Sequence, residues 1–139
     1  MHDIKFIREH PDRFDLALKR RGIAPLAEEI VALDKARRDV QSTLQDKQSR
    51  RNDASRQIGQ IKAQGGDADA IMREVAQLKT DIPALEAQDA ELEAQLHEHL
   101  ISLPNMLDDV VPDGEDETQN ELVREVGEKP QFSFTPKDH

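Results

Sequence analysis

The stretch that decides the fold runs from Ile30 to Ile61 and reads IVALDKARRDVQSTLQDKQSRRNDASRQIGQI; a second, from Ile71 to Leu103, reads IMREVAQLKTDIPALEAQDAELEAQLHEHLISL. Both carry mostly apolar residues at alternating spacings of three and four, which is the 3.5-residue repeat of a coiled coil. In the first stretch these seam positions are Ile30, Leu33, Arg37, Val40, Leu44, Lys47, Arg51, Ala54, Ile58 and Ile61. In the second they are Ile71, Val75, Leu78, Ile82, Leu85, Asp89, Leu92, Leu96, His99 and Leu103. The pattern predicts two long amphipathic helices.

A glycine pair, Gly65-Gly66, separates the two stretches, so the helices are expected to pack antiparallel as one hairpin. Facing residues should then have residue numbers with a nearly constant sum, and we predict layers such as Ile61 with Ile71. A first helix from Ala27 to Gln64 would be about 57 Å long at about 1.5 Å per residue. The sequence therefore predicts an extended arm.

Composition limits how much of the chain can form a round core. Of its 139 residues, 36% are hydrophobic, 3% are aromatic and 35% are charged, which suits a two-helix seam better than a large globular core. The absence of cysteine excludes disulfides, thiolate metal sites and a cysteine nucleophile. No secretory signal and no apolar run of about 18 residues is present. We expect a soluble, cytoplasmic protein without a membrane partner.

Helix signals also appear outside the two long stretches. Asp3 suits the N-cap of a short helix, Pro11 suits the first turn of another, and Gly22 suits its C-terminal stop. Pro25 is expected to open the first long helix, and Asp67 to cap the second. The side chains predicted to cover the base of the hairpin are Phe6, Ile7, Phe14 and Leu18, lying near Leu33, Val40, Leu96 and Leu100.

The predicted fold class is all-α: a long antiparallel two-helix coiled-coil hairpin with two short N-terminal helices at its base and an irregular C-terminal tail. Three parts are expected, with short helices in residues 1–26, the arm in 27–103 and an acidic linker in 104–139. Pro83 faces outward in this register and should bend the second helix or interrupt its bonding near Lys79. In the tail, Leu122–Val126 is a candidate strand, and Phe132 and Phe134 lack a core to enter.

Charge is distributed unevenly along the chain, whose formal net charge is −10. Residues 1–64 hold fourteen basic and ten acidic side chains, whereas residues 65–139 hold five basic and nineteen acidic ones. Within residues 47–64, five basic side chains accompany a single acid, Asp53. The distal part of the first long helix is therefore a local basic patch on an acidic protein.

Catalytic and metal-binding residues are not predicted. The carboxylates of the second helix occupy solvent positions without a convergent pocket. His97 and His99 are two residues apart, unlike the i, i+4 ligands of helical zinc sites, and His99 is expected in the seam near Leu33. The acidic run after Val111 lacks the ligand spacing of a calcium loop, and no Gly-Lys-Ser/Thr follows Gly65-Gly66 to cradle a phosphate.

The basic residues of the arm divide into two groups. Arg50 opposite Asp81, and Lys47 one layer from Asp89, are expected to be mainly structural ion pairs. The residues predicted to bind nucleic acid are Arg51, Arg56, Lys62, Arg73 and Lys79. A cationic strip on a rigid rod suits a phosphate backbone, although by charge alone a solvated face is an equal alternative.

Several fragments together resemble one family, the bacterial seryl-tRNA synthetases, in their N-terminal region. The fragments are Asp3-Ile-Lys-Phe-Ile-Arg-Glu-His-Pro11, Ala17-Leu-Lys-Arg-Arg-Gly22, the hairpin, Ser102-Leu-Pro-Asn105, Val111-Pro-Asp-Gly-Glu-Asp-Glu117 and Phe132-Ser-Phe-Thr-Pro-Lys-Asp-His139. Their order and spacing over all 139 residues make the match specific. Pro83 departs from the family pattern of a straight arm.

The resemblance implies a tRNA-binding arm that grips the long variable stem and elbow of tRNA(Ser), and by family likeness tRNA(Sec). It implies a class II serine–tRNA ligase as the full-length protein, a homodimer using ATP and Mg²⁺, with those sites beyond His139, no cofactor in this chain and no DNA partner. The chain alone is expected to be inactive. The alternative is a non-enzymatic coiled-coil adaptor that binds protein helices through its acidic face.

Overall fold

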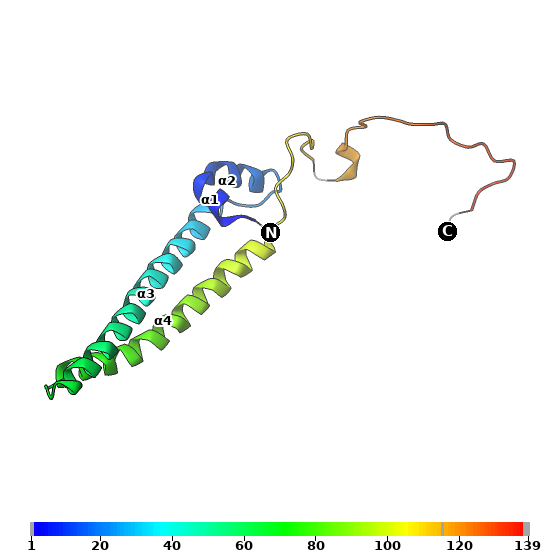
Figure 1. Cartoon of the computed structure of the whole chain (residues 1–139). Helices are drawn as coiled ribbons and strands as arrows, with labels where there is room; N and C mark the ends of the chain where they lie inside the picture. The colour runs from blue at the N-terminus through cyan, green and yellow to red at the C-terminus, as the bar shows by residue number, and fades with distance from the viewer. Residues whose placement is uncertain (1, 115, 138–139) are drawn as a thin grey trace. The chain divides into compact units, whose positions relative to one another are not determined.

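The computed structural model describes residues 2–114 and 116–137 of the chain. Its helices are α1 (Ile4–Glu9), α2 (Pro11–Lys19), α3 (Ala27–Ala63) and α4 (Asp69–Ser102), followed by a short 3₁₀ turn, η1 (Glu117–Gln119). Figure 1 shows α3 and α4 side by side as a long hairpin, with α1 and α2 at its open end. Strands are absent from the residues described. The predicted all-α hairpin is confirmed.

Contacts between residues divide the chain into two units, Met1–Leu107 and Asp108–His139. The first unit contains α1 to α4, and the second contains η1, with its other described residues in irregular conformation. Within the described ranges, none of the helices is both long and apolar enough to cross a membrane.

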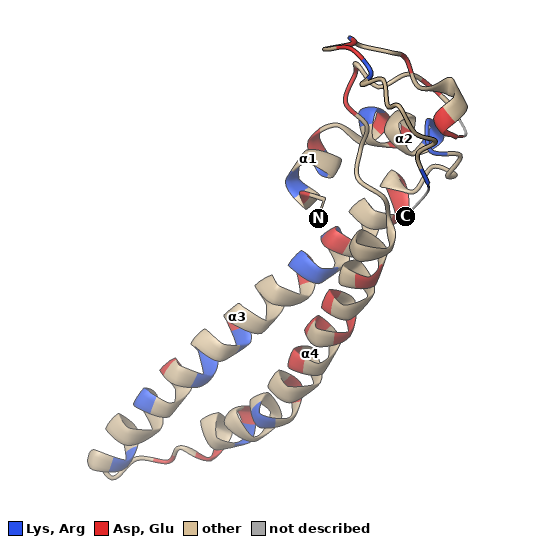
Figure 2. Ribbon diagram, turned by 90° about the vertical axis from the view of Figure 1, so that its right-hand side faces the viewer, with Lys and Arg blue, Asp and Glu red and all other residues tan. Residues whose placement is uncertain are grey.

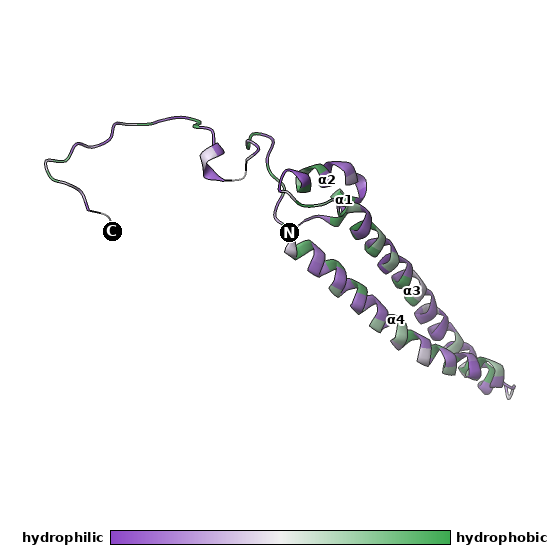
Figure 3. Ribbon diagram, turned by 180° about the vertical axis from the view of Figure 1, so that it is seen from behind, coloured by the Kyte–Doolittle hydropathy of each residue, from purple (hydrophilic) through white to green (hydrophobic). Residues whose placement is uncertain are grey.

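The seam of the hairpin follows the predicted spacing. Every predicted seam position is at least partly buried, and Ala54, Leu78 and Ile82 are buried in its distal half. Figure 3 shows apolar and polar segments alternating along both helices. With 37 residues, α3 is about 55 Å long at about 1.5 Å per residue. The seam is narrow, because the outward positions of both helices are exposed.

The largest core lies at the root, where α1 and α2 meet the hairpin. Ile7, Phe14 and Leu18 are fully or almost fully buried, with exposures of 0%, 0% and 1%, and they pack with Ile30 and Leu96. Phe6, Leu33 and Leu100 belong to the same cluster, as predicted, whereas Val40 lies outside it and is only half-buried.

A buried acid joins the first helix to the arm. Asp34 on α3 is only 7% exposed, and its Oδ2 accepts hydrogen bonds from Arg8 of α1 at 3.1 Å and from Arg38 at 3.0 Å. Two guanidinium groups thus compensate the buried carboxylate. This triad fixes α1 against the first turns of α3.

Helix caps confirm part of the predicted local structure and correct one point. Asp3 caps α1 by accepting from the Lys5 amide at 2.8 Å, and Gly22 has the positive φ of +70° that suits a C-terminal stop. Pro25, however, does not open α3. The helix begins at Ala27, and its first amides donate to Asp15 of α2, which accepts from Leu26 and Ala27 at 2.9 Å each.

The tip of the hairpin is a tight glycine turn. Gly65 has φ +71°, and the Gly66 amide donates to the Ile61 carbonyl at 2.9 Å. A Cβ on Gly66 would lie 2.9 Å from Ile61 Cγ2, which leaves no room for a larger residue without a shift. Asp67 accepts from the amide of Asp69, the first residue of α4, at 2.8 Å, but the N-cap position is not Asp67 as predicted: it is Ala68, which is buried.

Pro83 lies inside α4 and is exposed, as the register predicted. Proline has no amide hydrogen, so the Lys79 carbonyl cannot receive the usual helical bond from this position. The helix nevertheless continues from Asp69 to Ser102, and Figure 2 shows α4 as a curved, uninterrupted ribbon. The proline is therefore accommodated without a break in the helix.

The second unit does not form the strand predicted at Leu122–Val126. Leu122, Val123 and Val126 are irregular and are 78%, 91% and 81% exposed. A strand needs a neighbour to accept its backbone hydrogen bonds, and the described residues of this unit supply none. Phe132 and Phe134 contact each other, with ring centroids 5.2 Å apart, but remain exposed.

Candidate nucleic-acid interface

Ion pairs cross the seam in the distal half of the hairpin, but not between the partners predicted. Arg50 does not pair with Asp81; its guanidinium donates to both carboxylate oxygens of Glu74 at 2.6 Å. Lys47 does not pair with Asp89; its Nζ lies 2.7 Å from Asp81. Both basic residues are structural, as expected, yet each reaches a carboxylate nearer the tip than predicted.

Asp89 forms its ion pair with Arg37 instead of Lys47. Arg37 lies 3.1 Å from Asp89 and also 3.1 Å from Glu93, bridging the two carboxylates. Each of these pairs joins α3 to a carboxylate of α4 that is nearer the tip than the predicted layers would place it, and Ala68 is buried at the tip. Half-buried Gln48 donates a 3.4 Å hydrogen bond to exposed Glu86.

These pairs neutralise the charges that take part in them. The hydrogen bond from Arg50 lowers the pKa of Glu74, and the hydrogen bonds from Lys47 and then Gln77 lower the pKa of Asp81. Glu74 in turn raises the pKa of Arg50. At neutral pH the pairs are therefore fully ionised and carry almost no net charge.

The five residues predicted to bind nucleic acid differ in their surroundings. Lys62, Arg73 and Lys79 are exposed and have no ion-pair partner among the described residues. Arg56 is 76% exposed and lies 3.2 Å from Asp53 in the same helix, a type of surface pair that contributes little. Arg51 is half-buried at its seam position and donates to Asn52 at 3.3 Å.

The seam has two flanks, which differ in charge. In an antiparallel pair, residues just after the d positions of both helices share one flank, and residues just before the a positions share the other. The first, here called the lysine flank, has as its distal members Ser55, Lys62, Met72 and Lys79. The second, here called the ion-pair flank, has as its distal members Arg50, Glu74 and Asp81, with Lys47 reaching from the seam. The cations without partners thus lie on the lysine flank or, like Arg73, on the outer surface.

Met72 was not among the predicted site residues. It is 43% exposed and follows the seam residue Ile71 directly, as Lys79 follows Leu78. Assigning every heptad position to a flank, and not only the charged ones, would have placed it between the two lysines.

The charge pattern is visible along the whole hairpin. Figure 2 shows basic bands along α3 and acidic bands along most of α4, with basic bands on α4 only toward the tip. The basic residues of α4 are Arg73 and Lys79. The distal part of α4 therefore mixes these cations with Asp69, Glu74 and Asp81, whereas the part nearer the root has acids without Lys or Arg.

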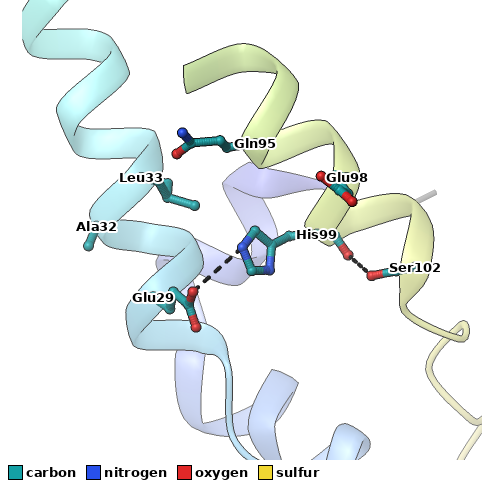
Figure 4. A pocket seen from close by; sticks show the side chains of 7 residues that line it. All are labelled: Glu29, Ala32, Leu33, Gln95, Glu98, His99 and Ser102. Atoms are coloured by element: carbon teal, nitrogen blue, oxygen red, sulfur yellow. Dashed lines mark hydrogen bonds and ion pairs between the residues drawn. The ribbon is translucent and has the colours of Figure 1, made fainter. Parts of the chain in front are cut away.

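A shallow groove lies between α3 and α4 near the root, and Figure 4 shows its side chains. His99 lies in the seam beside Leu33, as predicted, and its Nε2 is 3.5 Å from Glu29. Among the described residues no group of three or more His, Cys, Asp or Glu side chains is arranged to hold a metal ion. None of the five basic residues predicted to bind nucleic acid lines this groove.

Comparison with known proteins identifies the family. The model of the seryl-tRNA synthetase N-terminal domain matches residues 1–107. The serine–tRNA ligase of Paramagnetospirillum magneticum is 50% identical over the whole chain, and that of Erythrobacter litoralis is 49% identical. The structure of seryl-tRNA synthetase from Pyrococcus horikoshii complexed with ATP is similar with a TM-score of 0.77 and 30% identity, over 85% of this chain and 27% of that one.

The helical hairpin thus has the fold of part of a solved aminoacyl-tRNA synthetase. The chain belongs to the seryl-tRNA synthetase N-terminal domain family. It spans about a third of the length of the serine–tRNA ligases that it matches, 33% in each of the two relatives above.

Proposed function

We propose that this chain is the tRNA-binding arm of a serine–tRNA ligase, a class II aminoacyl-tRNA synthetase that joins serine to tRNA(Ser), and also to tRNA(Sec). The arm performs no chemistry. It grips the long variable stem and the elbow of the tRNA through Arg51, Arg56, Lys62, Arg73 and Lys79.

The observation that carries this proposal is the set of exposed distal cations without an ion pair, Lys62, Arg73 and Lys79, on a rod about 55 Å long. Lys and Arg side chains that replace condensed counterions on a phosphate backbone give sequence-independent affinity. Double-stranded RNA is recognised mostly by shape and backbone, and an extended cationic edge matches such a target. Relatives named serine–tRNA ligases supply the identity of the RNA.

The remaining properties belong to the whole protein. We propose that it is a cytoplasmic homodimer that uses ATP and Mg²⁺ in the part of the relatives' length that this chain does not span, with no DNA or membrane partner. The three parts of the chain are the root helices in residues 1–26, the arm in 27–103 and a linker to the catalytic part in 104–139.

The test is binding of the 139-residue chain to a tRNA with a long variable arm, compared with a tRNA that has a short one, over a range of salt. We expect tighter binding to the first tRNA and a steep loss of affinity with salt. In the full-length enzyme, replacing Arg56 and Lys62 with Glu should raise the serylation KM and leave serine-dependent pyrophosphate exchange intact.

Equal and salt-insensitive binding of both tRNAs would contradict the proposal. It would favour the adaptor alternative, in which the acidic face of α4 binds helices of a protein partner.

A further inference from the structure

We propose that RNA docks against the lysine flank of the hairpin, with Lys62 and Lys79 on phosphates and Met72 on the sugar surface between them, and that the ion-pair flank faces away from the RNA. The inference rests on the proposed function. It adds which side of the arm is the binding side and which apolar residue takes part.

The ion-pair flank cannot supply much attraction for a polyanion. Both oxygens of Glu74 already accept from Arg50 at 2.6 Å, and Asp81 accepts from Lys47 at 2.7 Å. A phosphate that approached Arg50 would have to displace a bidentate carboxylate, which is among the stronger charged hydrogen-bond arrangements. It would also meet the negative charge of that carboxylate.

The lysine flank has the opposite properties. Lys62 and Lys79 are exposed, and neither has an ion-pair partner among the described residues. Ser55 lies on the same flank, and its hydroxyl donates to the Arg51 carbonyl at 2.8 Å. None of the distal members of this flank is acidic. The cationic part ends toward the root at Glu86, which pairs with Gln48. Counterions on this flank are therefore available for release.

Met72 distinguishes this flank from an ordinary solvated face. It is 43% exposed. It precedes Lys79 by one heptad, which is two helical turns, or about 10.5 Å along α4 at about 1.5 Å per residue. A flexible thioether between two lysines contacts apolar surface while the ammonium groups reach the phosphates. The wide, shallow minor groove of an RNA duplex offers ribose surface next to the backbone. The combination fits RNA better than an acidic peptide.

The experiment compares matched pairs of substitutions in the 139-residue chain, titrated with a tRNA that has a long variable arm. Lys62→Gln with Lys79→Gln removes two charges from the lysine flank. The control, Arg50→Gln with Glu74→Gln, removes an ion pair from the other flank and leaves net charge unchanged. Circular dichroism checks that both variants keep the hairpin.

The lysine-flank variant should flatten the slope of log affinity against log salt by about 1.4 to 1.8 units, at roughly 0.7 to 0.9 per phosphate contact. Affinity should fall on the order of 10²-fold at 50 mM salt and about tenfold at 200 mM. The control should keep the affinity and slope of the wild type. Met72→Gln should weaken binding about three- to tenfold with an unchanged slope, because an apolar contact releases no counterions.

The outcomes separate this inference from the proposed function. A wild-type chain that does not bind the tRNA would overturn the proposed function. A wild type that binds, with a lysine-flank variant of unchanged slope or a control that loses as much affinity, would place the RNA on another side of the arm. Wild-type affinity in Met72→Gln would remove Met72 from the contact.

Discussion

The root and the distal half of the hairpin are built from the same two helices, yet they are stabilised differently. At the root, Ile7, Phe14 and Leu18 are removed from water and Asp34 binds two arginines. In the distal half the apolar seam is narrow, and the ion pairs Lys47–Asp81 and Arg50–Glu74 also connect α3 to α4. The root is therefore stabilised by buried apolar contacts, and the distal half by a narrow seam and solvent-accessible ion pairs.

The comparison also separates two uses of basic side chains. Arg8 and Arg38 at the root compensate a buried carboxylate, whereas Lys62 and Lys79 pair with no carboxylate among the residues that the structure describes. Positive charge is structural where it is paired and available where it is not. Four predictions test the contrast, in order of decreasing effect.

Removing the central aromatic of the root should have the largest effect. Phe14 is fully buried, so Phe14→Ala should lower the free energy of unfolding by about 3 to 5 kcal/mol, measured by urea denaturation. Leu16→Ala on the same helix is the control, because Leu16 is 59% exposed and its change should stay within about 0.5 kcal/mol. Similar losses in both variants would mean that α2 does not seal a core.

The distal half should be open to stabilisation at its proline. Pro83→Ala restores an amide that donates to the Lys79 carbonyl, and the exposed position tolerates alanine. We expect a gain of about 1 to 3 kcal/mol in the free energy of unfolding, with slower amide exchange in α4 around residue 83 and little change at the root. An unchanged midpoint would show that the neighbouring residues are adapted to the curved helix.

The cap that α2 supplies to α3 should have a smaller effect. Asp15→Ala leaves the amides of Leu26 and Ala27 without their acceptor, and we expect a loss of about 1 kcal/mol. Asp15→Asn keeps an oxygen at the same place and should recover most of this loss. A loss in the asparagine variant equal to that in alanine would assign the effect to charge instead of capping.

The smallest effect concerns pH. The pKa values of Glu74 and Asp81 are lowered in the folded chain by Arg50 and Lys47, so their contribution is present above their ordinary pKa values, 4.5 and 3.8, and is lost as pH falls through the lowered ones. Glu74→Gln with Asp81→Asn should therefore reduce the difference in urea midpoint between pH 7 and pH 3. The change should be modest because both pairs are solvent-accessible. An unchanged pH dependence would mean that these pairs do not stabilise the distal half.

Much of the fold could be predicted because its signals are local. The heptad spacing located α3 and α4, and the glycine pair located the turn, since helix period and turn conformation depend on neighbours a few residues apart. The five basic residues of the candidate site were also predictable by type and position. Their identity as RNA contacts stays a prediction, because no charge pattern distinguishes a phosphate-binding strip from a solvated face without its partner.

The sequence by itself determined that this chain is a helical hairpin with a basic distal strip, because a repeated apolar spacing has one stable solution when a single turn joins two stretches. Only the tertiary structure decided the pairing across the seam. Asp81 and Asp89 lie one turn to either side of the residue predicted to face Lys47, so the pattern admits both, and only the folded hairpin shows that Lys47 pairs with Asp81. The cap from Asp15 has the same origin, since its partners are 11 and 12 residues away and meet it only when α2 packs on the root.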